Sequence, residues 1–299
     1  MTDWPALAFR PPTVRNRLRR GSRACPLALR DVVGGMVGEA FALPIVWAPS
    51  LAVARAALVA AKEAGSALGL VAPTEAPERW FDVVTAVADE IAPGLPLLLS
   101  AVVVLLPGPI DRARALRQAQ RLVDAGMTHL VVDLDAVDPE LRAEELARVA
   151  EPALERGLGV ECLLPAGEGG LPAPEEAFSF LAELGTLGAS PDLAGVRLAR
   201  GGPGDAGFWR SIESLADATG GVPLALRGAP AARIARGLRP GLVRAVDDGG
   251  AAAAASGVDG AAERAEARAY AEAGSLVDAV RAEGSAAVVA AALQRSREE

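Results

Sequence analysis

Polar side chains suited to small-molecule chemistry follow the apolar, strand-length runs of this chain. Two or three carboxylates can hold Mg²⁺ through oxygen ligands, and arginine can bind a phosphate or carboxylate through two parallel hydrogen bonds. Asp133 and Asp135 have the same strand parity, so both can face one side of a sheet. Gly201 and Gly202 lie shortly before a predicted helix near Phe208, whose first N–H groups can bind an anion. The full set is Asp133, Asp135, Glu161, Arg197, Arg200, Arg227, Asp247 and Asp248.

The same residues also have a structural interpretation, and we favour it. Acids and arginines at strand ends pair with one another and neutralise the charge there. Cys162 follows Glu161 and points the opposite way, which is typical of a small buried hydrophobe.

Histidine and lysine, the usual tools of carbon–carbon chemistry, are almost absent. The chain has one histidine, His129, and one lysine, Lys62. A catalytic zinc needs about three N, S or O ligands, and a Schiff-base lysine should project from a barrel strand. His129 begins a predicted strand, so we expect a surface or helix-cap histidine there, and Lys62 falls near the end of a predicted helix.

The elements that must position these groups alternate regularly. Eight apolar runs are nearly continuous in hydrophobicity, as in parallel strands covered on both faces. Helical segments separate most of them at spacings of about 30 residues, the size of a βαβ unit. The pattern predicts an α/β fold, a closed (β/α)8 TIM barrel, with an open doubly wound sheet as the alternative. The runs are Leu43–Ala48, Ala67–Ala72, Leu95–Leu106, His129–Leu134, Gly159–Leu164, Leu193–Leu198, Val222–Leu226 and Leu242–Val246.

The barrel is predicted to span residues 42–250, with an extension on either side. Residues 1–41 form a basic N-terminal arm, for which we expect a solvated or loosely docked tail; docking on an acidic partner is the alternative. Residues 251–299 form a C-terminal helical extension that covers the barrel or mediates assembly into a homo-oligomer. The arginines of the arm are Arg10, Arg15, Arg17, Arg19, Arg20, Arg23 and Arg30.

Composition narrows the class of protein further. A net charge of −8 argues against nucleic-acid binding. Cys25 and Cys162 cannot make a disulfide framework. No apolar run reaches membrane-spanning length, and no apolar signal core lies near the N-terminal charges, so we expect a cytoplasmic protein without a membrane partner.

Five segments resemble the class II fructose/tagatose-bisphosphate aldolase superfamily, including its non-catalytic tagatose-bisphosphate aldolase subunit type. The resemblance covers most of residues 42–250 and implies a TIM barrel. It also implies a site at the strand ends, with Asp133 and Glu161 as catalytic candidates. The strand-end chemistry described above, and not the family pattern, gives the substrate- or anion-binding candidates Arg200, Arg227, Gly201, Gly202, Gly228 and Asp248. The segments are Ile45–Ser50, His129–Asp133, Gly159–Glu161, Pro223–Gly228 and Gly241–Asp248.

The departures from that family fall on its metal- and phosphate-binding positions. The superfamily's Asp-His pair after strand three corresponds to Ala101 and Val102, and its later metal-binding histidines to Arg200 and Arg227. Its phosphate-binding Gly-Gly-Ser-Gly becomes Gly228–Ala231. An asparagine of strand eight becomes Val246, and an acidic residue after strand five becomes Leu163. We therefore expect no zinc site and no required cofactor, with Mg²⁺ left open.

Three functions follow from these observations. The first is a catalytically degenerate aldolase-like barrel acting as a scaffold, regulatory or binding subunit. The second is an active lyase or aldolase that acts on a phosphorylated or carboxylated small molecule by Mg²⁺ or Arg/carboxylate chemistry. The third is an FMN-dependent barrel like nitronate monooxygenase. The segment Pro44–Pro49 loosely resembles the opening sequence of those enzymes.

Overall fold

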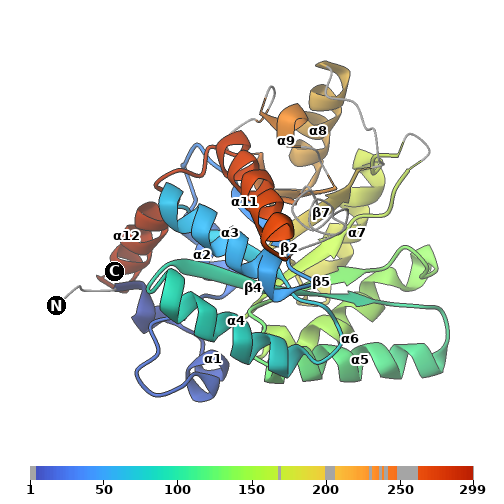
Figure 1. Cartoon of the computed structure of the whole chain (residues 1–299). Helices are drawn as coiled ribbons and strands as arrows, with labels where there is room; N and C mark the ends of the chain where they lie inside the picture. The colour runs from blue at the N-terminus through green and yellow to red at the C-terminus, as the bar shows by residue number, and fades with distance from the viewer. Residues whose placement is uncertain are drawn as a thin grey trace.

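Parallel strands close into a barrel in the computed structural model of the chain (Figure 1). The structure describes residues 5–167, 170–198, 206–228, 231–235, 238, 242–247 and 262–298. Each barrel strand pairs with the next in sequence, and the last, β9, pairs with the first, β2. The predicted (β/α)8 barrel and its eight strands are confirmed. The strands are β2 (Leu43–Trp47), β3 (Leu68–Val71), β4 (Pro96–Val104), β5 (His129–Asp133), β6 (Gly159–Leu163), β7 (Leu193–Arg197), β8 (Leu224–Arg227) and β9 (Val243–Asp247).

Helices surround the barrel and bury an outer apolar core against the strands. The first of them shows why they form where they do. The Ser50 hydroxyl accepts a hydrogen bond from the Val53 N–H at its start, and Gly65 ends it with φ +61°, a conformation that favours glycine. The helices are α3 (Leu51–Ala64), α4 (Pro77–Ile91), α5 (Pro109–Asp124), η2 (Pro139–Leu141), α6 (Arg142–Leu154), α7 (Pro174–Thr186), α8 (Ala206–Ala218) and α9 (Ala231–Ile234).

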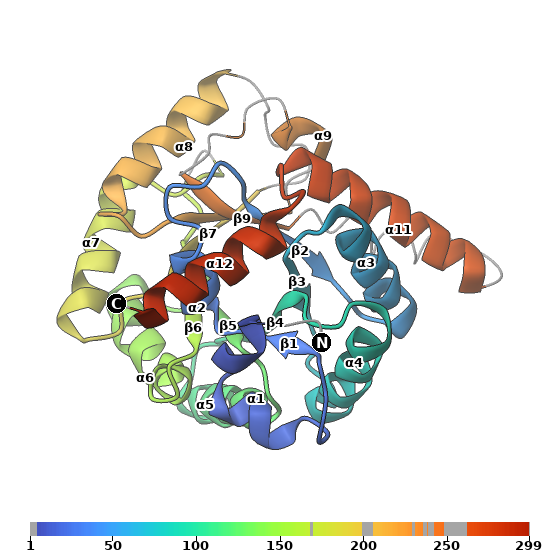
Figure 2. The same ribbon diagram turned by 90° about the vertical axis from the view of Figure 1, so that its left-hand side faces the viewer.

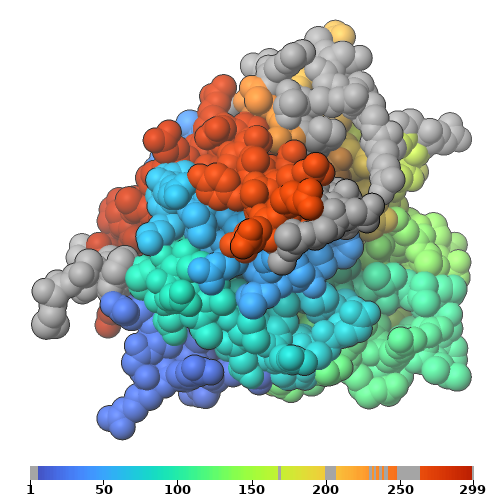
Figure 3. All heavy atoms as spheres, in the orientation of Figure 1, coloured from blue at the N-terminus to red at the C-terminus, as the bar shows by residue number. Residues whose placement is uncertain are grey.

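The described part of the C-terminal extension forms two helices, and they pack on the barrel. α11 (Ala262–Ala279) lies along α3 on the outside (Figures 1 and 3). Tyr270 Oη donates a hydrogen bond to Glu63 of α3. α12 (Ser285–Glu298) lies across the N-terminal ends of the strands (Figure 2). Self-association through these helices stays a prediction. Within the described residues, no helix has the length and apolar character needed to cross a membrane.

The N-terminal arm is packed, so the expectation of a solvated tail is wrong for the described part of the arm. Its elements are η1 (Pro5–Phe9), α1 (Pro12–Arg17), β1 (Cys25–Pro26) and α2 (Leu29–Gly34). β1 adds to the sheet by pairing with the start of β4. Apolar residues alternate with the arginines along this segment, and burying them stabilises it against the barrel. The buried ones include Val14, Cys25, Leu27, Leu29, Val32 and Met36.

An inner apolar core joins this segment, α12 and the inward side chains of the strands. Leu29 packs against Gly159 at the start of β6, where a Cβ atom would lie 2.1 Å from the Leu29 Cβ. Val289 and Leu293 of α12 belong to the same core. The N-terminal end of the barrel is therefore closed by residues from both extensions.

Replacing Gly159 with alanine is expected to lower the free energy of unfolding by about 3 kcal/mol. The new methyl group would collide with the Leu29 Cβ, which can move only if the backbone of α2 or β6 moves with it. Gly274→Ala in α11 is the matched control, since nothing lies within 4 Å of a Cβ there. The control should be neutral or more stable by up to about 1 kcal/mol. Urea denaturation of both variants measures the difference. Equal stabilities would contradict the seating of α2 against β6.

Candidate functional site

A cavity of about 220 Å³ opens at the C-terminal ends of the strands, which we call the mouth of the barrel. TIM-barrel enzymes have their active sites at this end. Each of the eight barrel strands contributes one lining residue. The walls from β2 to β6 are apolar, whereas the walls from β7 to β9 carry charge. The lining residues, in strand order, are Trp47, Val71, Val102, Val131, Leu163, Arg197, Arg227 and Asp247.

The charged side is organised by a buried ion pair between Arg227 and Glu161. Arg227 Nε donates to Glu161 Oε1 over 2.8 Å, and Nη2 donates to Oε2 over 2.5 Å. Glu161 is completely buried, and the Arg227 side chain is only 10% exposed. Arg227 Nη1 also lies 3.7 Å from Asp247 Oδ2. Both nitrogens that face Glu161 are thus committed to it.

A glycine on the strand between them makes room for this pair. Gly195 of β7 lies between β6 and β8, and a Cβ atom there would lie 2.5 Å from Glu161 Oε1. Burial alone would raise the pKa of Glu161, but the adjacent Arg227 charge and the hydrogen bonds lower it to about 2. Glu161 is therefore ionised at neutral pH.

Arg197 holds two carboxylates at the rim of the cavity. Its Nη2 donates to Asp133 Oδ2 over 2.6 Å, and its Nη1 donates to Asp135. The Asp135 N–H donates to Asp133 Oδ1 over 3.1 Å, which fixes the two acids together. β5 ends at Asp133, so strand parity does not extend to Asp135; the two acids lie together because both pair with Arg197, whose positive charge offsets their repulsion.

Beneath the ion pair lies the chain's single histidine, and its predicted surface or helix-cap position is wrong. His129 is completely buried inside the barrel. Its Nδ1 lies 2.8 Å from Ser100 Oγ, and its Nε2 lies 3.4 Å from Glu161 Oε2. A neutral ring with its proton on Nε2 suits both neighbours, because Ser100 then donates to Nδ1 and the N–H faces the carboxylate. Burial, opposed by Glu161 and supported by Arg227, lowers the His129 pKa.

Ser100, His129 and Glu161 have the residue types of a hydrolase triad, but their burial excludes that chemistry. All three side chains are 0% exposed, so no substrate carbonyl can reach the Ser100 hydroxyl. Together with Arg227 and Asp247 they form a continuous polar column from the barrel interior to the cavity.

Of the predicted site residues, Glu161 and Arg227 form one ion pair, whereas Asp133 belongs to a separate pair with Arg197, which lies opposite Arg227 in the register of β7 and β8. Gly228 follows β8 with φ +75°, and its N–H donates to the Asp247 carbonyl over 2.7 Å. The remaining predicted residues, Arg200, Gly201, Gly202 and Asp248, lie outside the described residues.

The described positions at which the chain departs from the family's ligand-binding residues fall into two groups. Val102 and Leu163 line the cavity together with Arg227. Ala101 and Val246 belong elsewhere: Val246 packs in the outer core, and its neighbour Asp247 faces the cavity in its place. Across the described ranges, no three His, Cys, Asp or Glu residues are grouped to hold a metal ion.

Sequence reasoning missed the interior role of His129 and Ser100. Strand parity could have revealed the position of His129. It precedes Asp133 by four residues on β5, so both side chains lie on the same face of the strand, the one that faces the barrel interior. The apolar half of the cavity was missed because Val71 and Val131 look like ordinary strand residues.

Comparison with solved structures shows that the chain shares its barrel fold with several aldolases. No protein-family model and no curated protein sequence matches the chain. A Coccidioides immitis protein described as a fructose-1,6-biphosphate aldolase aligns over 90% of this chain and 99% of its own, with TM-score 0.66 and 17% identity.

The Escherichia coli K12 aldolase YdjI aligns over 86% of this chain and 98% of its own, with TM-score 0.65 and 17% identity. The fructose-bisphosphate aldolase of Campylobacter jejuni aligns over 86% and 94%, with TM-score 0.62 and 12% identity. At these identities, the shared property is the fold.

Removing one partner of the buried pair should be costly. Arg227→Met is expected to lower the free energy of unfolding by about 3–5 kcal/mol, because it leaves the Glu161 charge buried and unpaired. Adding Glu161→Gln should recover part of that loss, so the double variant will be more stable than the sum of the single variants predicts. Arg197→Met is the control: its side chain is 45% exposed, and its loss should cost about 0–1 kcal/mol. Additive losses in urea denaturation would contradict the pairing.

The lowered His129 pKa predicts a loss of stability in mild acid. Below pH 6.5, the ordinary pKa of histidine, His129 binds a proton in the unfolded chain but not in the folded protein. The free energy of unfolding therefore decreases as the pH decreases. The slope is bounded by one proton, about 1.4 kcal/mol per pH unit. His129→Asn removes the titrating ring and should flatten the dependence between pH 7.5 and 5.5. An unchanged slope in that variant would show that another group is responsible.

Proposed function

We propose that this protein is an aldolase-fold barrel without metal-dependent aldol activity, which acts as a binding, regulatory or scaffold subunit. The observation that carries this proposal is the use made of Arg227. At a position that corresponds by sequence resemblance to a metal-binding histidine, the chain places a cation held by Glu161 through two hydrogen bonds. A fixed guanidinium supplies locally the positive charge that a metal would supply, but it cannot accept a substrate oxygen as a ligand.

Val102 supports the same proposal from the opposite side of the cavity. It stands where the resemblance places a histidine of the Asp-His pair, and it lines the cavity as an apolar side chain. With Val71, Val131 and Leu163 it makes a wall that offers a sugar phosphate no hydrogen-bond partner from its side chains.

The charge around the cavity also disfavours a bisphosphate substrate. The described ion pairs at the mouth contain four carboxylates and two guanidinium groups. A phosphate would have to displace a carboxylate from Arg197 or Arg227, close to the negative charges of these described acids.

An active lyase that uses arginine and carboxylate groups is the second candidate. One observation favours it: the mouth keeps a cavity of about 220 Å³ with Arg197 and Arg227 on its wall. In that function Arg197 would release Asp133 to bind the substrate's carboxylate or phosphate, and Asp133 would serve as the base. The flavin alternative is tested by the visible absorption spectrum of the purified protein.

A subunit role requires assembly. The exposed arginines of the N-terminal arm and the outer faces of α11 and α12 are the surfaces we propose for association with another copy or a partner. The mass of the purified protein in solution tests self-association.

The decisive assay supplies the purified protein with Zn²⁺, Mg²⁺ or Mn²⁺ and ketose bisphosphates. We expect no cleavage above the rate with buffer alone and less than stoichiometric metal retained after dialysis. A class II aldolase assayed in parallel shows that the conditions support the reaction. Metal-dependent cleavage that is lost in Asp133→Asn would overturn the proposal in favour of an active lyase.

A further inference from the structure

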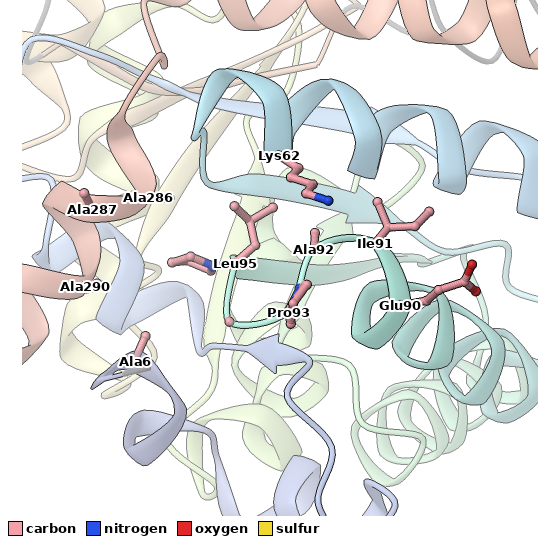
Figure 4. Close-up of a pocket in the computed structure, with 12 residues that line it drawn as sticks. Ala6, Lys62, Glu90, Ile91, Ala92, Pro93, Leu95, Ala286, Ala287 and Ala290 are labelled. Carbon is pink, nitrogen blue, oxygen red and sulfur yellow. The ribbon is translucent and has the colours of Figure 1, made fainter. Parts of the chain in front are cut away.

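A larger cavity, of about 430 Å³, lies at the opposite end of the barrel from the mouth (Figure 4). It is bounded by the last turns of α3 and α4, the turn that leads into β4, and residues of η1 and α12. β4 begins at this cavity with Pro96 and reaches the mouth cavity at Val102, so the two cavities lie toward different ends of one strand.

The walls of this basal cavity are mainly apolar. Ile91 and Leu95 provide the larger side chains. α12 contributes only small side chains, Ala286, Ala287 and Ala290, and so leaves space between itself and the barrel. Small-molecule sites have volumes of about 300–1,000 Å³ and similarly apolar linings.

Two charged side chains border the cavity, and they differ in their partners. Glu90 Oε1 lies 3.9 Å from Arg55 Nη2. The side chain of Lys62, the chain's single lysine, is exposed and makes no hydrogen bond or ion pair with any residue that the structure describes. Figure 4 shows its side chain reaching from α3 toward the α4–β4 turn. The basal cavity therefore combines a mainly apolar interior with one ammonium group that pairs with no described side chain.

We propose that the basal cavity binds a small amphipathic monocarboxylate, with its aliphatic or aromatic body among Ile91, Leu95 and the α12 alanines and its carboxylate on Lys62. A lysine ammonium acts as a compact point charge and does not require the two-pronged geometry of arginine, so it suits a single carboxylate at a cavity rim. Glu90 argues against a dianion, which would lie near its negative charge.

Binding here would join three separate parts of the chain. A ligand would contact the barrel, η1 and α12 together, and it would stabilise the folded protein by mass action. This site is independent of the function proposed for the mouth, because none of its lining residues lines the mouth cavity.

Octanoate and benzoate, titrated into the full-length protein by calorimetry, are the test probes. We expect saturable binding with a Kd of about 1 mM or lower for at least one of them. Lys62→Met keeps the aliphatic stem and should weaken binding about tenfold or more, whereas Lys62→Arg keeps the charge and should retain most of the affinity. Octan-1-ol should bind more weakly than octanoate.

Two further variants control for fold and for location. Arg295→Met removes a charge from α12 outside the cavity lining and should leave binding unchanged. Ala290→Phe fills the cavity and should abolish binding, while the melting temperature without ligand checks that this variant is folded. Absence of saturable binding by either carboxylate, or equal affinity in wild type and Lys62→Met, would overturn the proposal.

Discussion

The buried Glu161–Arg227 pair is the constraint on which the mouth of this barrel depends. Removing two ions from water is costly, and the cost is offset only by close, well-oriented partners. Glu161 therefore needs the two nitrogens of Arg227. The pair also needs Gly195, because a side chain at this position of β7 would occupy the space of the Glu161 carboxylate. His129 lies beneath this pair, and its pKa is lowered chiefly by its own burial, with Glu161 opposing that effect and Arg227 adding to it.

Much of the fold was predictable because its signals are local. Eight apolar runs at regular spacing were enough to predict a closed parallel barrel, and helix ends such as Gly65 followed from simple capping rules. The packing of the N-terminal arm was not predictable from the same signals. Its arginines dominate the composition, whereas its burial depends on contacts such as Leu29 with Gly159, which are distant in sequence.

The candidate site was predictable in its residue types and less so in its pairings. Strand ends indicated Asp133, Glu161 and Arg227, but Asp133 and Asp135 lie together through Arg197 and not through strand parity. Parity could not show that Arg227 reaches across β7 to Glu161, because that contact depends on a missing side chain at Gly195. It also could not distinguish Val246 from Asp247 at the mouth, since β9 carries an irregularity in its register with β8.

The closure of the barrel base by both extensions has a consequence for biosynthesis. η1 and α12 contact each other at the base, yet the whole barrel separates them in sequence. During translation, the inner-core residues of the N-terminal segment are made before the barrel strands. Their contacts with Val289 and Leu293 can form only after α12 has been made. Until α12 leaves the ribosome, the apolar surface it covers stays open to water, and such surface favours aggregation or chaperone binding. The base of the barrel can thus be completed only after all eight barrel strands have been made.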